Sequence, residues 1–279
     1  MARRSRPADL PNFNKPPVTE VALSVQFDTI TGFSNVHAGL LWAEFRSEYP
    51  VASEKPPLAP QFETFGGGGV APQAPFRFAT YSQPPAARFW FEEASGAHLM
   101  QIQNDRIVHN WRKRDANEYP RYEPIADRFE DEIRRFQEFL RREGLGELQS
   151  NQCEVTYINT IELPDRSNPH DQLQRITLLC GQPKMPDQLH SEIMSAQARY
   201  ILEKDGQPFG RVYVNFSPVI RGSDLAPAVQ LDITARGRPA AQSADAALNL
   251  LDSERKIVVR TFAAVTNSEM HRLWERIDV

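Results

Sequence analysis

The sequence predicts an α+β fold in which an antiparallel sheet carries long helices on one face. Three observations lead to this class: short alternating strands follow one another with turn residues between them, a long amphipathic helix closes each series, and the whole order occurs twice. An apolar sheet face and the apolar stripe of a helix bury each other as two layers. With 41% hydrophobic and 24% charged residues among 279, the composition is that of an ordinary globular protein and excludes a disordered or collagen-like chain.

The first 17 residues are predicted to have no regular secondary structure. Residues 1–17 combine three arginines with four prolines and have no apolar period, which predicts a flexible leader. A strand follows from Val18, where apolar side chains alternate with polar ones, and Ser34 is a suitable cap for a helix that runs to Tyr49.

A surface excursion and a meander are predicted next. Residues 50–75 hold six prolines and, at Gly66–Gly69, four consecutive glycines, a composition typical of an exposed loop. Three or four short strands then form an antiparallel meander, in the segments PFRFATYS (75–82), ARFWFEE (87–93), HLMQIQ (98–103) and RIVHNWRK (106–113).

The helix predicted over residues 123–143 has the clearest pattern in the chain. Ile125, Phe129, Ile133, Phe136 and Leu140 recur at spacings of 4, 4, 3 and 4, which is one face of an α-helix. The adjacent glycine at 144 is typical of a helix end.

The same order of elements then starts again. Strands are predicted in CEVTYINTIEL (153–163), SAQARYILEK (195–204), RVYVNFSP (211–218) and PAVQLDITARG (227–237), Ser243 caps a long helix, and Asn267 or Ser268 caps a last short one. This order predicts an internal duplication of a strand–meander–helix unit, with a first unit at 18–145 and a second at 152–279. Because the joint at 144–151 is short and has no proline-rich linker, we expect one continuous module, a curved sheet with both helices on its concave face, rather than two separate sandwiches.

Several ordered patches point to a family. The segments PPVTEVALSVQF, HNWRKRDANEYPRYEPI, EVTYINTIEL and VVRTFAAVTNSEMHRLW resemble the sporadically distributed bacterial proteins of the TIGR04255 type, over a span from about Pro16 to Trp274. The resemblance implies one module over residues 18–279. The family has no established activity or catalytic residues, so it assigns no site. Its patchy distribution is typical of mobile or defence-associated genes.

Charge and composition limit the classes of function. The formal net charge of −4 disfavours a protein that coats nucleic acid. Two cysteines, Cys153 and Cys180, are too few for a disulfide framework or a four-cysteine zinc site, and no window is apolar enough for a signal peptide or a membrane-spanning helix, so we expect a cytoplasmic protein. Motifs of hydrolases, zinc proteases and phosphate loops are absent from the sequence, and no cofactor or metal site is predicted. A dispersed catalytic site leaves no motif, so an enzyme remains an open alternative.

One segment interleaves cations with aromatic rings, as a single-stranded nucleic acid or a nucleotide would require. Its candidate contact residues are Trp111, Arg112, Lys113, Arg114, Tyr119 and Arg121. Acidic residues lie in the same stretch, which favours the other interpretation: a strand-to-helix connection in which the aromatic rings are packed anchors.

A second set of candidates consists of polar residues within otherwise apolar strands, namely Glu20, Tyr157, Asn159 and Asn215. Such side chains either line a cleft between sheet and helices or hydrogen-bond adjacent strands, and we favour the second role. The leading functional hypothesis is therefore a non-enzymatic recognition or scaffold protein that acts through protein partners, for instance in a bacterial defence or mobile-element system. The alternative is a ligand, nucleotide or nucleic-acid binder that uses the concave cleft and residues 110–122.

Overall fold

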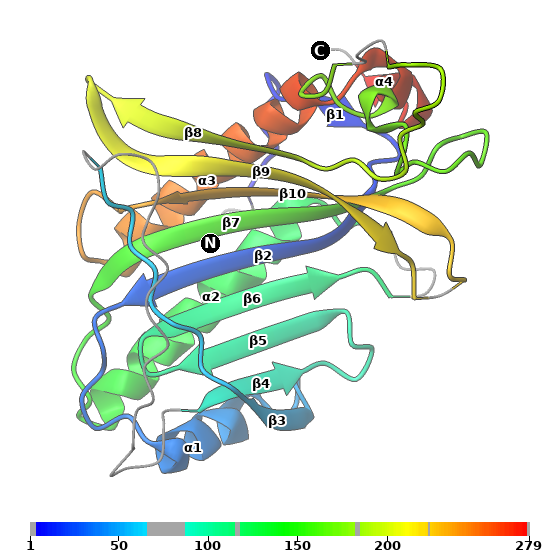
Figure 1. Cartoon of the computed structure of the whole chain (residues 1–279). Helices are drawn as coiled ribbons and strands as arrows, with labels where there is room; N and C mark the ends of the chain where they lie inside the picture. Colours follow the sequence, from blue (N-terminus) through cyan, green and yellow to red (C-terminus); the bar gives the residue numbers. More distant parts are fainter. Residues whose placement is uncertain (1–3, 66–86, 115–117, 182–184, 223, 278–279) are drawn as a thin grey trace.

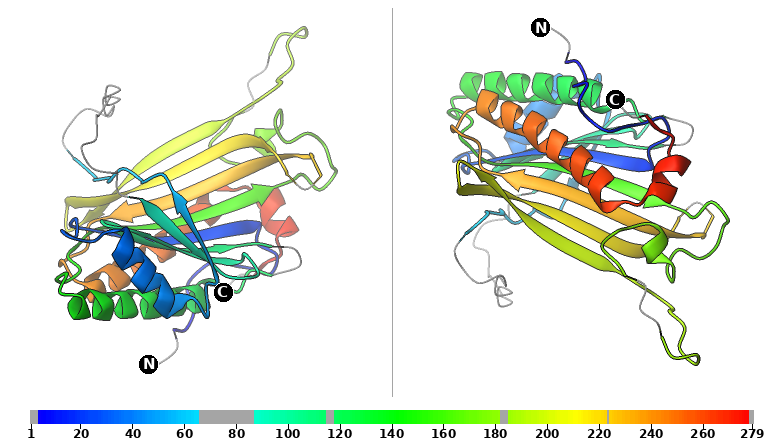
Figure 2. Two further views of the ribbon diagram at one scale, coloured as in Figure 1. Left: turned by 90° about the horizontal axis from the view of Figure 1, so that it is seen from below. Right: turned by 90° about the horizontal axis from the view of Figure 1, so that it is seen from above.

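The chain folds into two layers, a sheet and a set of helices that lie on one of its faces (Figures 1 and 2). The structure, a computed structural model, describes residues 4–65, 87–114, 118–181, 185–222 and 224–277. Two features expected from the sequence, the strand at 75–82 and the run Gly66–Gly69, lie outside these residues.

The described residues form one large sheet of nine strands, with every neighbouring pair antiparallel. Its order is β3 (Val51–Lys55), β4 (Arg88–Glu92), β5 (His98–Gln103), β6 (Arg106–Arg112), β2 (Val18–Phe27), β7 (Ser150–Ile161), β10 (Pro227–Gly237), β9 (Gln207–Ile220) and β8 (Ala196–Lys204). The predicted antiparallel α+β class is confirmed. Strand β3 is a correction, because the sequence predicted only an exposed loop there. An edge strand needs no alternating apolar pattern, since little of its surface is buried.

Four helices lie in the described ranges: α1 (Asn35–Phe45), α2 (Tyr122–Arg142), α3 (Ala244–Val265) and α4 (Ser268–Leu273), together with a short 3-10 turn (Leu173–Arg175). The α2 stripe predicted from its spacing is confirmed, since all five of its apolar residues are fully buried. Caps fall where the sequence placed them. The Ser243 hydroxyl accepts a hydrogen bond from the Ala246 amide at 3.2 Å, and the Asn267 side chain caps α4.

The two halves of the sheet have matching strand orders. Strands β2 and β7 pair at the centre, β6, β5 and β4 continue on one side, and β10, β9 and β8 continue on the other. Each half ends in a long helix, and α2 and α3 lie together behind the sheet (Figure 1). One core cluster of buried residues spans both halves of the sheet. The predicted duplication requires such an order but stays a prediction, because β3 and α1 occur in the first half without described counterparts in the second.

The described part of the expected flexible leader lies against the body of the protein. Leu10 and Phe13 are 1% and 4% exposed, and the Phe13 ring packs edge-on against Phe262 with centroids 5.3 Å apart. A short strand β1 (Asn12–Phe13) pairs with β11 (Arg276–Ile277). Single apolar residues between prolines show no period, yet they suffice to anchor an extended segment in a groove. In the described part of the chain, no helix is both long and apolar enough to cross a membrane.

Candidate functional site on the open face of the sheet

The two faces of the sheet have different surroundings. Side chains alternate along each strand, so residues such as Leu23, Val155 and Ile233 point toward α2 and α3 and are completely buried. Their neighbours in the strands point to the opposite face, which the viewer of Figure 1 sees from the front. We call this the open face. It is largely polar, and its charged side chains include Glu20, Arg88, Arg106, Arg112, Glu154, Arg211, Asp232 and Arg236.

An extended segment of residues 56–65, here called the cover segment, crosses the open face from β3 toward β9 (Figure 1). Sheet side chains hold its main chain. The Gln103 amide accepts from the Leu58 nitrogen at 2.8 Å and donates to the Leu58 oxygen at 2.9 Å. Gln26 accepts from the Gln61 nitrogen at 2.9 Å, and Arg106 donates to the Ala59 oxygen at 3.2 Å. The face therefore binds an extended peptide largely through that peptide's backbone.

One side chain of the cover segment is clamped. The Glu63 side chain is only 4% exposed, and its carboxylate accepts hydrogen bonds from Arg211, from Arg236 at 3.3 Å and from the Tyr213 hydroxyl at 2.8 Å. Arg211 also donates to the Thr64 oxygen at 2.6 Å. Burial and the hydrogen bond to Glu63 raise the pKa of Tyr213, so this hydroxyl stays a donor at neutral pH. The second half of the sheet thus holds the carboxylate of Glu63 between two arginines and a tyrosine.

A cation–aromatic cluster lies on the same face in the first half of the sheet. Lys55, Arg88 and Arg112 lie 5.0, 5.6 and 5.8 Å from the centroid of the Trp90 ring. Arg112 also donates to Glu92 at 2.8 Å. The Nε atoms of Arg88, Arg106 and Arg112 are buried and have no hydrogen-bond partner among the described residues. Buried donors without partners are costly, which marks this region as one that an additional acceptor would stabilise.

The structure does not gather the six basic and aromatic candidates on one surface. Arg112 lies on the open face, whereas Trp111 points to the helices, is 2% exposed and packs against Tyr119 with centroids 5.3 Å apart. Lys113 and Arg114 are exposed beyond the end of β6. Arg121 precedes α2 in a left-handed conformation, with φ of 75°, and donates to the Phe13 oxygen. This geometry matches a packed connection better than a continuous nucleic-acid track.

The polar candidates in the strands also divide between the two faces. Glu20 and Asn215 lie on the open face, where Asn110 donates to Glu20 at 2.6 Å and Asn215 donates to Ser217 at 3.0 Å. Burial raises the pKa of Glu20. The Asn110–Glu20 contact joins adjacent strands, as the strand-linking interpretation requires, whereas the Asn215–Ser217 contact lies within β9.

Tyr157 and Asn159 point toward the helices, where the Tyr157 hydroxyl lies 3.0 Å from that of Tyr119 and Asn159 donates to the Leu231 oxygen. Together with Tyr119 and Arg121 they line a cavity of about 40 Å³. Residues from both candidate sets therefore meet at one place, but the space is suited to water rather than to an organic ligand.

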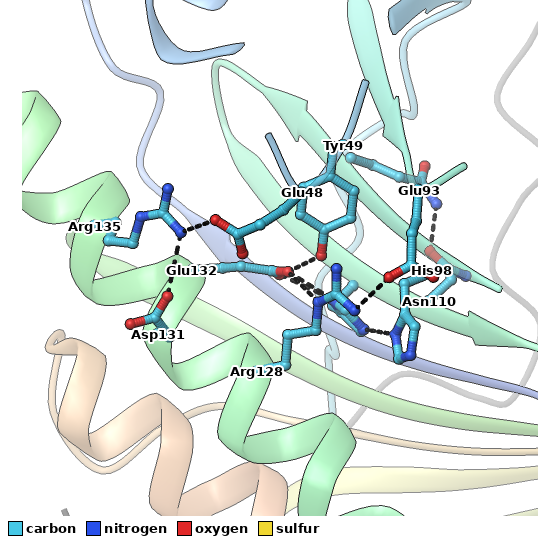
Figure 3. Close-up of polar contacts among 11 residues, drawn as sticks. Glu48, Tyr49, Glu93, His98, Asn110, Arg128, Asp131, Glu132 and Arg135 are labelled. Atoms are coloured by element: carbon cyan, nitrogen blue, oxygen red, sulfur yellow. Dashed lines mark hydrogen bonds and ion pairs between the residues drawn. The ribbon is translucent and has the colours of Figure 1, made fainter. Parts of the chain in front are cut away.

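A second polar cluster, beneath α1 and α2, was not singled out from the sequence (Figure 3). His109 is fully buried on β6. Its Nδ1 lies 2.9 Å from both oxygens of Glu132, and its Nε2 lies 3.0 Å from Nδ1 of His98. The Tyr49 hydroxyl donates to Glu132. The sequence does contain an indication of this cluster. Glu132 lies three residues after Phe129 and four before Phe136, so it falls on the apolar stripe of α2. We call this group the buried network.

Burial away from solvent shifts the pKa values of two groups in the buried network. Burial and the neighbouring His109 lower the pKa of His98 to about 4, and burial together with Glu132 raises the pKa of Tyr49. Arg128 lies over the Tyr49 ring and donates to Glu93 at 3.1 Å. Both nitrogens of His109 are partnered within the protein. No group of three or more potential metal-ligating His, Cys, Asp or Glu residues occurs within the described ranges. This arrangement connects helices to the sheet.

Comparison of the sequence with protein-family models and with curated proteins finds no match. We take the open face as the candidate site, because it carries both the side chains that hold Glu63 and the cations around Trp90.

Proposed function

We propose that the protein is a non-enzymatic recognition module whose open face binds an extended acidic segment of a partner protein. The cover segment is the observation that carries this proposal, because it is a peptide already bound on that face. Side chains from β2, β5 and β6 contact its backbone, and the Arg211–Arg236–Tyr213 clamp holds its carboxylate.

The chemistry of these contacts suggests what the face would select. Hydrogen bonds to main-chain groups accept many sequences but require an extended conformation, whereas two guanidiniums around one carboxylate require Glu or Asp at a single position. The guanidiniums of Arg88 and Arg112 beside Trp90 supply further positive charge for a second acidic residue.

The cover segment would then compete with the partner. A tethered peptide has an effective concentration on the order of millimolar, so a partner peptide in solution must overcome that advantage. Glu63 supplies the one buried carboxylate of the cover segment, and removing it should weaken the competitor while leaving the clamp arginines in place.

The experiment measures binding of a fluorescent peptide, PPLAPQFETF, which has the sequence of residues 56–65, by fluorescence anisotropy. The full chain is used as wild type, Glu63→Ala, and Glu63→Ala with Arg211→Ala. We expect Glu63→Ala to bind at least about tenfold more tightly than wild type, and the added Arg211→Ala to abolish that gain, because a charge-assisted hydrogen bond contributes about 1.5–3 kcal/mol. The matched control is Glu63→Ala with Arg221→Ala, an arginine paired with Glu162 and Asp224 elsewhere, which should bind like Glu63→Ala alone.

A peptide in which the glutamate is replaced by glutamine should bind Glu63→Ala at least about tenfold more weakly than the parent peptide. Equal binding of both peptides, or no binding to Glu63→Ala, would overturn the proposal. A labelled 20-nucleotide single-stranded DNA is the second probe. If that DNA binds in a salt-dependent, Arg211-dependent manner while the peptide does not, the nucleic-acid alternative replaces peptide recognition.

A further inference from the structure

The two edges of the sheet differ in how well they are protected. Strand β3 at one edge has five residues and ends in the charged pair Glu54 and Lys55. Strand β8 at the other edge has nine residues, contains no proline, and pairs with β9 on one side; in the described part of the chain no strand pairs with its other side. Long unprotected edges present a row of free backbone donors and acceptors to a second strand.

The side chains of β8 are unusually apolar for an exposed edge. Tyr200 and Ile201 are 44% and 56% exposed. The segment that leads into β8 projects from the body of the protein (Figure 2), and it carries Leu189 and Ile193, which are 53% and 64% exposed. Apolar groups gathered along a free strand edge are typical of an interface.

The sequence of β8 is complementary to itself. In an antiparallel pair about a two-fold axis at Ile201, Arg199 lies opposite the partner subunit's Glu203, and Glu203 lies opposite the partner subunit's Arg199. Residues 199, 201 and 203 share one face of the strand, so each ion pair flanks the central isoleucine pair. On the other face, Tyr200 lies opposite the partner subunit's Leu202. Moving the two-fold axis by one residue, to Tyr200, would instead place Arg199 opposite the partner subunit's Ile201.

We infer that β8 is a homodimer interface, through which two copies of this chain join their sheets edge to edge with Ile201 at the two-fold axis. A C2 interface brings the same patch of each copy together, and an antiparallel strand pair satisfies this symmetry directly. The strand itself is regular, because the irregularity near Leu202 comes from an extra residue on β9. The inference is independent of the proposed peptide binding.

The test is the mass of the full-length protein in solution, measured by sedimentation velocity across a concentration series. We expect wild type to dimerise. Arg199→Glu and Glu203→Arg should each weaken the dimer at least about tenfold, since each places two like-charge pairs at the interface. The double variant, Arg199→Glu with Glu203→Arg, should recover dimerisation because it restores both ion pairs in exchanged positions.

Val51→Lys is the matched control, because Val51 is 54% exposed on the opposite edge strand and should leave the dimer intact. All the substituted residues are exposed, so far-UV circular dichroism should show an intact fold in each variant. A wild type that stays monomeric, or a double variant that dimerises no better than the single ones, would overturn the inference. Loss of the dimer in Val51→Lys would place the interface at β3 and also overturn it.

Discussion

On the helix-covered face of the sheet, the buried network joins His109, Glu132 and Tyr49, which come from β6, α2 and the turn after α1. On the open face, Arg211 and Arg236 meet Glu63, which comes from the cover segment. Both places bury a carboxylate among donors. The first lies under two helices and its Glu132 side chain is 1% exposed, whereas the second lies under one extended segment whose other side chains are largely exposed.

This difference indicates two roles for similar chemistry. A carboxylate enclosed by helices cannot leave without opening the core, so its hydrogen bonds add to the stability of the native fold. A carboxylate brought by a segment with few apolar contacts can be exchanged for one from another molecule, since little buried surface is lost when that segment leaves. The proposed recognition function rests on this contrast.

The largest expected effect concerns the buried network. Glu132→Ala should lower the free energy of unfolding by about 3–5 kcal/mol, because it leaves His109 and Tyr49 buried without their acceptor. Urea denaturation followed by circular dichroism measures it. Tyr49→Phe removes one donor and keeps the ring, so it should cost only about 1–2 kcal/mol. If both variants lowered the free energy of unfolding by the same small amount, the buried network would not stabilise the fold more than the open face does.

An intermediate effect should appear as a pH dependence. The pKa of His98 is lowered in the folded protein from its ordinary 6.5 to about 4. His98 is therefore protonated below about pH 6.5 in the unfolded chain, but only near pH 4 in the folded protein. The stability that neutral His98 contributes is complete above pH 6.5 and is lost as the pH falls toward 4.

The pH effect is isolated by comparison with a variant. We expect the difference in melting temperature between wild type and His98→Gln to change between pH 7 and pH 4.5, with wild type losing relatively more on acidification. A difference that stays constant over this range would mean that His98 titrates normally and that the buried network is open to solvent.

The smallest expected effect concerns the basic segment at the end of β6. Arg112→Ala with Arg114→Ala should lower the free energy of unfolding by about 1 kcal/mol or less, because Arg114 is exposed and Arg112 pairs with a Glu92 that is itself 31% exposed. Trp111→Ala in the same segment should cost about 3–5 kcal/mol, because its ring is buried against the helices. Chemical denaturation of both variants compares them. A large loss from the arginine pair would mean that these cations help to hold the fold.

Much of the architecture could be predicted because it depends on local repeats. A period of two residues in 227–237 and of about 3.6 in 123–143 identifies a strand and a helix, and Ser243 and Asn267 mark helix starts through hydrogen bonds to the next turn. The buried Glu132 could also have been suspected, since it interrupts an apolar stripe. Each of these features can be recognised from a stretch of sequence no longer than about one helix.

The candidate site could not be predicted in this way. Glu63 lies in a proline-rich stretch with no period, and its partners Arg211 and Arg236 are 148 and 173 positions away. Nothing local links them. In the predicted basic–aromatic segment, residues that are adjacent in the sequence are separated in space. Trp111 and Arg112 point to opposite faces of the sheet, because they alternate along β6.

By itself, the sequence determined the class of fold, the boundaries of the long helices and the alternation of the strands, since these follow from backbone geometry and the burial of apolar groups along short stretches. The tertiary structure decided the strand order, which face stays uncovered, and which carboxylate enters the arginine clamp. The physical reason is that pairing between distant segments depends on the three-dimensional path of the whole chain, which no local period encodes.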